Sequence, residues 1–323
     1  MNLNQHEVRL KVLPLAAAGG LLAHLLAVAA FRRRTDEMTA RLEHASVAEN
    51  TVSRVPSIIQ SFTQNAIHDP VPNTVWLSQR GEMRPNPGDP WRQFTAEQVI
   101  RIPEPSFAWP ARIQMGPLVS ARILDCYVEG EGLLEARLFG SARLASAAAS
   151  RSELMRYLAE PAWAPHNPKL SWREIDAATA EVSAVSPAGK AQVRLIFENG
   201  DITRVEADDR PRIVGRCTVP TRWEGRCYDY RELDRCRIPT RGVASWLLEG
   251  VPFEYWRGQV TEFRVKKPRS WKPHIDLNQC CACQGPDYVA DGLAGALSER
   301  RSAISGPDGR PKHGHRRRLH PHP

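Results

Sequence analysis

Apolar residues recur along this chain with three spacings, and each spacing predicts a different kind of element. Near the N-terminus, residues 12–31 form a continuous run of 20 residues without a formally charged side chain. Between residues 73 and 265, apolar and polar residues alternate in short segments, which is typical of strands with one buried face. Helical spacing, with apolar residues three or four apart, occurs at 35–49, after Pro56 and at 150–158.

The uncharged run predicts a helix that spans a membrane, because about 20 residues of helix cover the hydrocarbon core. It ends at the arginines 32–34, which is a stop-transfer pattern and not the small-residue site that ends a cleaved signal peptide. We therefore expect a single-pass membrane protein, with a cleaved signal peptide or a buried soluble helix as alternatives. The arginines outnumber Arg9 and Lys11 on the other flank, which favours a cytoplasmic globular domain.

The alternating segments predict about eleven or twelve strands and a fold class that is mainly β with a few helices. The helix over 150–158 has a capping-box pattern, Ser150 to Glu153, and an apolar stripe that we expect to cover the open face of the sheet. The first predicted strand begins near residue 73. The others cover 91–102, 106–115, 119–128, 133–139, 170–175, 179–185, 191–198, 202–207, 225–232, 237–248 and 255–265.

The charge of the chain is concentrated at its C-terminal end. Residues 266–323 contain 11 Lys or Arg and 5 Asp or Glu, a net charge of +6 out of the formal +8 of the whole chain. This end is also rich in Pro, Gly and His, so it has too little apolar surface to fold and we expect it to be disordered. Because the rest of the chain is nearly neutral, no nucleic-acid partner is predicted.

These patterns divide the chain into four predicted parts. They are an N-terminal transmembrane anchor at 1–34, a helical stalk at 35–70, a β-rich globular domain at 71–267 and a disordered basic tail at 268–323.

The seven cysteines do not form a recognisable disulfide framework, since their number is odd and their spacing irregular. Cys126 is predicted to be a core residue. One disulfide among Cys217, Cys227 and Cys236 is an alternative if the domain faces an oxidising compartment. Three further cysteines and several histidines lie in the tail, where a solvated tail is favoured over a zinc or copper site, so we predict no metal and no cofactor. They are Cys280, Cys281, Cys283, His274, His313, His315, His320 and His322.

Several long segments resemble an uncharacterised family of bacterial membrane-anchored proteins, a domain of unknown function. The longest is PTRWEGRCYDYRELDRCRIPTRGVASWLLEG at 220–250. The others are WPARIQMGPL at 109–118, YVEGEGLLEARLFG at 127–140, SELMRYLAEPAW at 152–163 and PFEYWRGQVTEF at 252–263. This resemblance implies a shared fold but brings no activity with it.

A shorter segment, YDYRELDRCRIPTRG at 228–242, resembles a strand–turn–strand element of lipoprotein-sorting carriers, although Arg235 replaces the usual turn glycine. That resemblance implies a curved antiparallel half-barrel-like sheet packed on helices, with an apolar hollow. It also implies an extracytoplasmic domain, whereas the flanking arginines favour a cytoplasmic one. The side of the membrane on which the domain lies is therefore left open.

The sequence contains no common hydrolase, nucleotide-binding or zinc-protease motif. We therefore expect a membrane-anchored binding module for a lipid or another hydrophobic ligand, with no catalytic residues assigned. The candidate ligand-binding residues are Arg112, Asp125, Tyr127, Trp223, Glu224, Asp229 and Tyr230.

Two of these groups have alternative interpretations. Arg112 is a candidate for holding an anionic head group, and a solvent-facing strand arginine is the alternative. Glu224 and Asp229 are the acid and base in the alternative of an enzyme of unknown class, or members of a salt bridge with Arg241. A structural domain that binds an unknown protein partner is the remaining alternative.

Overall fold

The computed structural model describes residues 4–44, 55–67, 72–162, 169–215 and 217–265, with side chains of the first helix described from residue 18 on. Within these residues it contains three helices and a sheet of 13 strands. The helices are α1 (Asn4–His44), α2 (Ser57–Ala66) and α3 (Ser150–Leu158). The strands are β1 (Thr74–Met83), β2 (Arg92–Arg101), β3 (Ser106–Gln114), β4 (Ser120–Val128), β5 (Glu131–Leu138), β6 (Ala142–Ala148), β7 (Ser171–Asp176), β8 (Thr179–Ser186), β9 (Gly189–Glu198), β10 (Asp201–Val214), β11 (Cys217–Leu233), β12 (Cys236–Leu248) and β13 (Val251–Arg264).

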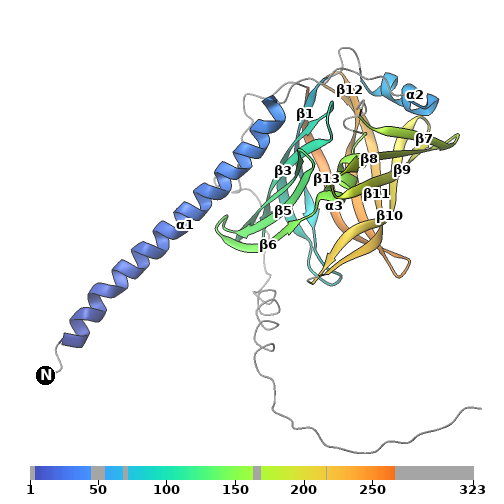
Figure 1. Cartoon of the computed structure of the whole chain (residues 1–323). Helices are drawn as coiled ribbons and strands as arrows, with labels where there is room; N and C mark the ends of the chain where they lie inside the picture. The colour runs from blue at the N-terminus through green and yellow to red at the C-terminus, as the bar shows by residue number, and fades with distance from the viewer. Residues whose placement is uncertain (1–3, 45–54, 68–71, 163–168, 216, 266–323) are drawn as a thin grey trace, which may run out of the picture. The chain divides into compact units, whose positions relative to one another are not determined.

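The sheet consists of two antiparallel meanders that meet at one seam. The strand order is β6-β5-β4-β3-β2-β1-β13-β12-β11-β10-β9-β8-β7, so β1 pairs with β13 in the middle. Helix α3 connects β6 to β7, which are the two edge strands. Figure 1 shows α3 inside the curve of the sheet, between the two meanders. The prediction of a mainly β, curved antiparallel half-barrel around helices is therefore confirmed.

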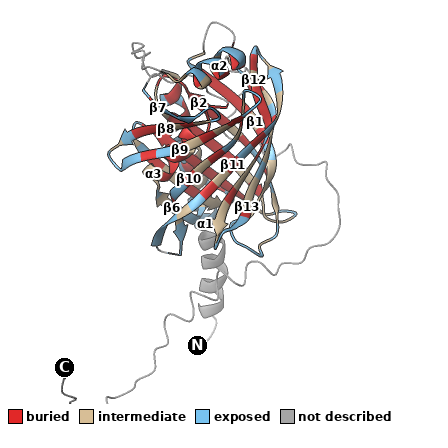
Figure 2. Ribbon diagram, turned by 90° about the vertical axis from the view of Figure 1, so that its right-hand side faces the viewer, coloured by how far each residue is buried: buried red, intermediate tan, exposed pale blue. Residues whose placement is uncertain are grey.

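The concave side of the sheet carries the larger core. On β3, alternate residues Phe107, Trp109, Ala111 and Ile113 face this side and are buried. The apolar residues of α3 pack against them, as predicted, and Figure 2 shows the buried residues along the inner side of the strands. The predicted capping box is wrong. The Ser150 hydroxyl accepts a hydrogen bond from the Gly132 amide at 2.9 Å instead, because the preceding strand β6 runs directly into the helix.

The convex side of the sheet carries a second, smaller core that includes residues of α1. Phe31 and Leu42 are buried there beside Trp76, Leu124 and Cys126. Because α3 covers one face of β4 and α1 the other, every residue of β4 is buried. The prediction of Cys126 as a core residue is confirmed.

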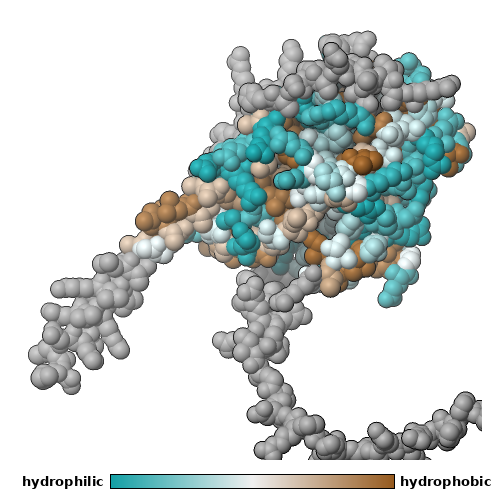
Figure 3. Space-filling model, in the orientation of Figure 1, coloured by the Kyte–Doolittle hydropathy of each residue, from teal (hydrophilic) through white to brown (hydrophobic). Residues whose placement is uncertain are grey.

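The prediction of a membrane-anchored, single-pass location is wrong. No helix among the described residues combines the length and the apolar character that crossing a bilayer requires. His24 hydrogen-bonds the Ser141 hydroxyl at 2.8 Å, and Arg34, predicted to flank the membrane, pairs with the buried Glu135 at 3.1 Å. Figure 3 shows apolar side chains gathered on α1. From Phe31 onward, α1 uses much of its apolar surface in packing on the sheet.

Other predictions had mixed outcomes. Residues 35–44 of the helix expected at 35–49 form the end of α1, residues 45–49 lie outside the described residues, and the helix after Pro56 is α2. β6 was missed, because six of its seven residues are exposed and it lacks an alternating pattern. The four cysteines that the structure describes, including Cys217, Cys227 and Cys236, are free. The predicted disordered tail, with its cysteines and histidines, lies outside the described residues, and the division of the chain at 70 and 267 stays a prediction.

Candidate functional site

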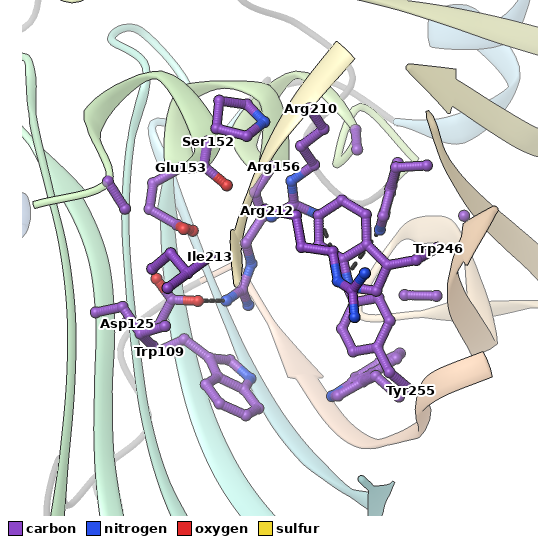
Figure 4. Close-up of a pocket in the computed structure, with 18 of the residues that line it drawn as sticks. Trp109, Asp125, Ser152, Glu153, Arg156, Arg210, Arg212, Ile213, Trp246 and Tyr255 are labelled. Carbon is purple, nitrogen blue, oxygen red and sulfur yellow. Dashed lines mark hydrogen bonds and ion pairs between the residues drawn. The ribbon is translucent and has the colours of Figure 1, made fainter. Parts of the chain in front are cut away.

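A cavity of about 690 Å³ lies on the concave side of the sheet, bordered by α3 and by strands of both meanders. Figure 4 shows charged side chains of β4 and α3 facing arginines and aromatic rings of the C-terminal strands. We call the first group the helix wall and the second the strand wall. The helix wall is Asp125, Glu153, Arg156 and Glu160, and the strand wall is Arg210, Arg212, Trp223, Trp246, Tyr255 and Trp256.

Arg156 is the centre of the helix wall. Its guanidinium pairs with the Asp125 carboxylate, and its Nε lies 3.2 Å from Glu160 Oε1. The same guanidinium lies over the rings of Phe107 and Trp109, with centroids at 4.6 and 5.1 Å. Glu153 and Arg156 are three residues apart on one face of α3, and Glu160 follows two residues after the end of the helix. A buried charge is tolerated only when it is paired and hydrogen-bonded, and both conditions are met here.

A chain of amide side chains extends this cluster to the sheet. Gln98 Nε2 donates to Glu160 at 2.7 Å, Gln79 Nε2 donates to Gln98 Oε1 at 2.9 Å, and Trp109 Nε1 donates to Gln79 Oε1 at 2.8 Å. Each buried donor of the chain has an acceptor, which fixes the orientation of Trp109 at the cavity.

Glu153 is the acid of the helix wall with the strongest shift. Burial raises its pKa well above the ordinary value, and the neighbouring Asp125 raises it further, whereas Arg210 and Arg156 lower it. Asp125 Oδ1 and Glu153 Oε2 are both buried without a donor. The raised pKa of Glu153 favours its protonated form, which has a donor to offer, while Arg156 is divided between Asp125 and Glu160.

The strand wall is an array of aromatic rings. Trp223 Nε1 donates to the Tyr255 hydroxyl at 2.9 Å, and Tyr255 stacks on Trp246 with ring centroids 5.5 Å apart. Trp256 stacks on Phe94 at 5.7 Å. Aromatic rings with a polar handle provide large contact area together with a fixed orientation.

Two tryptophans of this wall occur in the pattern Trp-x-Gly. Trp223 is followed by Gly225 and Trp256 by Gly258. In both cases the indole of the tryptophan lies over the glycine two residues later, on the same side of the strand. A Cβ on Gly225 would lie 2.8 Å from the Trp223 ring, and one on Gly258 would overlap the Trp256 ring. Only glycine permits this close approach.

Two β-bulges determine which side chains reach the cavity. In β13, Ala244 is opposite Trp256 and Ser245 opposite Glu254, so Tyr255 is the extra residue. Tyr255 and Trp256 therefore both line the cavity although they are adjacent in sequence.

The bulge in β10 lies between Ala207, opposite Trp223, and Arg210, opposite Thr221. Simple alternation from Ala207 would turn Arg210 to the convex side. The extra residue reverses this, so that Arg210 lies over the rings of Trp223 and Trp246, at 4.8 and 5.5 Å. Arg212 follows on the same side, 5.9 Å from the Trp246 ring.

Ion pairs hold the bulge of β10 in place. Arg194 binds Asp208 with nitrogen–oxygen distances of 2.6 and 2.8 Å, and this arginine keeps the pKa of Asp208 below its ordinary value. Arg151 of α3 binds the Asp209 carboxylate at 2.7 Å and its carbonyl at 3.0 Å. The position of Arg210 is therefore tied both to β9 and to α3.

The structure brings only two of the seven predicted site residues to the cavity. Asp125 and Trp223 line it, one on each wall. Arg112 lies on the other face of β3, opposite Arg122 in the pairing with β4. Tyr127 is buried in the concave core opposite Phe107. Tyr230 donates to the Ile202 carbonyl at 2.9 Å, away from the residues that line the cavity.

Glu224 and Asp229 do not form a pair. Glu224 faces away from Trp223 along β11 and pairs with Arg226, while Asp229 pairs with Arg231 at 3.0 Å. Asp229 also lies 3.7 Å from Arg241, which is the salt bridge considered as the alternative. Hydrogen bonds from Thr240 and Arg231 lower the pKa of Asp229, so it remains ionised at neutral pH. This arrangement does not resemble an acid and a base that face a common substrate.

Sequence reasoning missed most residues of both walls. Two signals were present in the sequence: the Trp-x-Gly repeat and the spacing of Glu153, Arg156 and Glu160 on a predicted helix. The inward turn of Arg210 and Arg212 had no such signal, because a bulge interrupts the alternation. Among the described residues, no three His, Cys, Asp or Glu side chains are grouped so that they could hold a metal ion.

No curated protein matches the chain. Among solved structures it is similar to a DUF1329 family protein from Desulfovibrio piger, with 8% identity, a TM-score of 0.35, and coverage of 70% of this chain and 92% of that one. It is also similar to a LolA superfamily protein from Nitrosomonas europaea, with 10% identity, a TM-score of 0.32, and coverage of 66% and 93%. A putative outer membrane lipoprotein-sorting protein domain from Vibrio parahaemolyticus has 8% identity, a TM-score of 0.35, and coverage of 64% and 90%.

At such identities and TM-scores these likenesses support no inference about a ligand. The match to a family model is different, because it extends over residues 53–265, more than half of the chain. It includes the segments of β3, α3, β11, β12 and β13 on which the resemblance to an uncharacterised family rests. The chain therefore belongs to DUF6920, a family of unknown function.

Proposed function

We propose that this protein binds a hydrophobic or amphiphilic small molecule, such as a lipid, in the cavity on the concave side of its sheet. The observation that carries the proposal is the cavity itself. Its volume of about 690 Å³ falls within the range of roughly 300–1,000 Å³ that is usual for small-molecule sites.

The composition of the strand wall supports an apolar ligand. Trp246, Tyr255 and Trp256 are only partly buried, although they lie on the inner side of a curved sheet. Aromatic surface that stays accessible inside a concavity is typical of a ligand site, because contact between water and apolar surface is unfavourable and an apolar ligand can replace that water. Apolar side chains of the N-terminal meander, such as Met83, Ile123 and Leu134, extend this apolar surface across the cavity.

The helix wall supports binding over catalysis. Asp125 and Glu160 are both bound to Arg156, so these three groups have their partners before any ligand enters. The alternative of an enzyme that uses Glu224 and Asp229 gains no support, since each is paired with its own arginine.

The test is to purify the full chain from its native type of cell without detergent and to identify bound lipids by extraction and mass spectrometry. Ala244 lines the cavity opposite Trp256, so Ala244→Phe should fill the space and abolish lipid recovery. Val185, 83% exposed in the hairpin of β8 and β9, provides the matched control Val185→Phe, which should retain the lipid. Equal recovery from both variants, or none from the wild type, would contradict the proposal.

A further inference from the structure

Five arginines line the cavity, and they differ in whether a carboxylate neutralises them. Arg151 is paired with Asp209, Arg156 with Asp125 and Glu160, and Arg226 with Glu224. Arg210 and Arg212 form no ion pair with any residue of the described ranges. Both belong to the strand wall, and both are turned inward by the bulge of β10.

Arg210 is the more buried of the two, with 7% of its surface exposed. Its Nη1 lies 3.4 Å from the Tyr255 hydroxyl, at the limit of a hydrogen bond, and its Nε is buried without any partner in the described structure. Stacking on Trp223 and Trp246 offsets part of the cost of burying the charge. It leaves the donors of the guanidinium fork unused, and these donors match the oxygens of a carboxylate or phosphate.

The acids across the cavity do not neutralise Arg210. Asp125 and Glu160 are bound to Arg156. Glu153 is the remaining acid; it forms no ion pair with Arg210, and burial raises its pKa well above the ordinary value. Neither Arg210 nor Arg212 therefore has a carboxylate within ion-pair distance among the described residues.

We propose that Arg210 and Arg212 bind the anionic head group, carboxylate or phosphate, of an amphiphile whose apolar chain lies against the aromatic rings of the strand wall. This inference rests on the proposed function and names the chemical class of its ligand. Tyr255 contributes its hydroxyl beside Arg210, and Trp223 positions that hydroxyl through its hydrogen bond.

The experiment is isothermal titration calorimetry of the full chain with three probes of equal chain length: dodecanoate, dodecyl phosphate and dodecanol, each below its micelle concentration. At least one anion should bind roughly 10- to 100-fold more tightly than dodecanol, since a charge-assisted hydrogen bond contributes that much to affinity. The anion that binds more tightly distinguishes a fatty-acid source from a phospholipid source.

The arginines are tested with Arg210→Gln and Arg212→Gln, which should remove the preference for the anion and leave dodecanol binding unchanged. Arg210→Lys keeps the charge and should retain part of the preference. Arg226→Gln, on the neighbouring strand, is the matched control, because Arg226 is already paired with Glu224 in the wild type. Arg210 is buried, so its variants can fail to fold. In that case the variant of the half-exposed Arg212 still provides the test.

The outcomes separate this inference from the proposed function. Equal affinity for anions and dodecanol, or a preference that survives both Arg210→Gln and Arg212→Gln, overturns the head-group inference and leaves hydrophobic binding intact. If no probe binds, both proposals fail.

Discussion

The two walls of the cavity use the same kind of side chain in opposite ways. On the helix wall, Arg156 is enclosed by Asp125 and Glu160, and burial raises the pKa of the remaining acid, Glu153. On the strand wall, Arg210 and Arg212 lie against aromatic rings and have no carboxylate partner within the described residues. The first arrangement is complete without a ligand, whereas the second leaves positive charge facing the cavity.

The difference teaches how to distinguish structural from ligand-directed arginines inside a cavity. Removing one partner of a buried, paired charge leaves the other partner without a counter-charge in a medium of low dielectric constant. Removing an arginine that has no acidic partner leaves no unpaired charge behind. The same substitution should therefore damage stability on the helix wall and ligand affinity on the strand wall.

The largest expected effect comes from Arg156→Leu. It leaves Asp125 and Glu160 buried without a counter-charge and should lower the free energy of unfolding by about 3–5 kcal/mol. Arg210→Leu should cost less than about 2 kcal/mol, because only stacking and one long hydrogen bond are lost. Urea denaturation of both variants measures the contrast, and equal losses would show that the two walls do not differ.

Glu153→Gln tests the proton on the helix wall. Since the native pKa of Glu153 is raised, its proton stabilises the folded state at low pH, and this stability is lost as the pH rises from 4.5 toward the raised value. The variant cannot ionise, so its unfolding free energy should fall less than that of the wild type as the pH rises above 4.5.

Glu97 provides the matched control for this pH dependence. It lies on the convex side of β2, and burial raises its pKa from 4.5 to about 7. By the same sign argument, Glu97→Gln should flatten the stability curve between pH 4.5 and 7 and leave the region above pH 7 unchanged. A stability curve of Glu153→Gln that keeps the wild-type slope above pH 4.5 would refute the raised pKa of Glu153.

Gly258→Ala tests the close approach of the Trp256 ring to Gly258 in the strand wall. The added Cβ overlaps the Trp256 ring, so the ring must move, at a cost of about 1–3 kcal/mol in unfolding free energy. Binding of an apolar probe such as dodecanol should weaken at the same time. Gly116→Ala is the control, because its Cβ would meet nothing nearer than 3.8 Å.

The smallest expected effect comes from Trp223→Phe, which keeps an aromatic ring but removes the donor to the Tyr255 hydroxyl. We expect a loss of about 1 kcal/mol in stability. If Tyr255 contributes to the head-group site, affinity for the preferred anion should also fall while that for dodecanol stays the same. A parallel loss for both probes would mean that Trp223 acts through packing alone.

Several features could be predicted from the sequence because they depend on local periodicity. The alternation at 106–115 predicted strand β3, and the stripe of α3 predicted a helix covering the sheet. Cys126 was correctly placed in a core. The same local view failed for residues 12–31, since an apolar run does not show by itself what surrounds it: Leu21, Leu22, Leu25 and Leu26 are exposed, whereas Phe31 at its end packs on the sheet.

The site depends on features that a linear pattern does not contain. Arg112 and Arg210 are both strand arginines, and only the bulge between Ala207 and Arg210 turns the second one inward. Whether an arginine is neutralised is also decided by partners distant in sequence, as Asp125 is for Arg156.

By itself, the sequence determined the antiparallel strands, the helix between the two meanders and the family, because periodicity, turn residues and long similar segments are properties of the chain. Only the tertiary structure decided which side chains meet at the cavity and that α1 packs on the sheet. The physical reason is that one extra residue in a strand reverses every later side chain, and that the charge state of a buried group depends on what folding brings beside it.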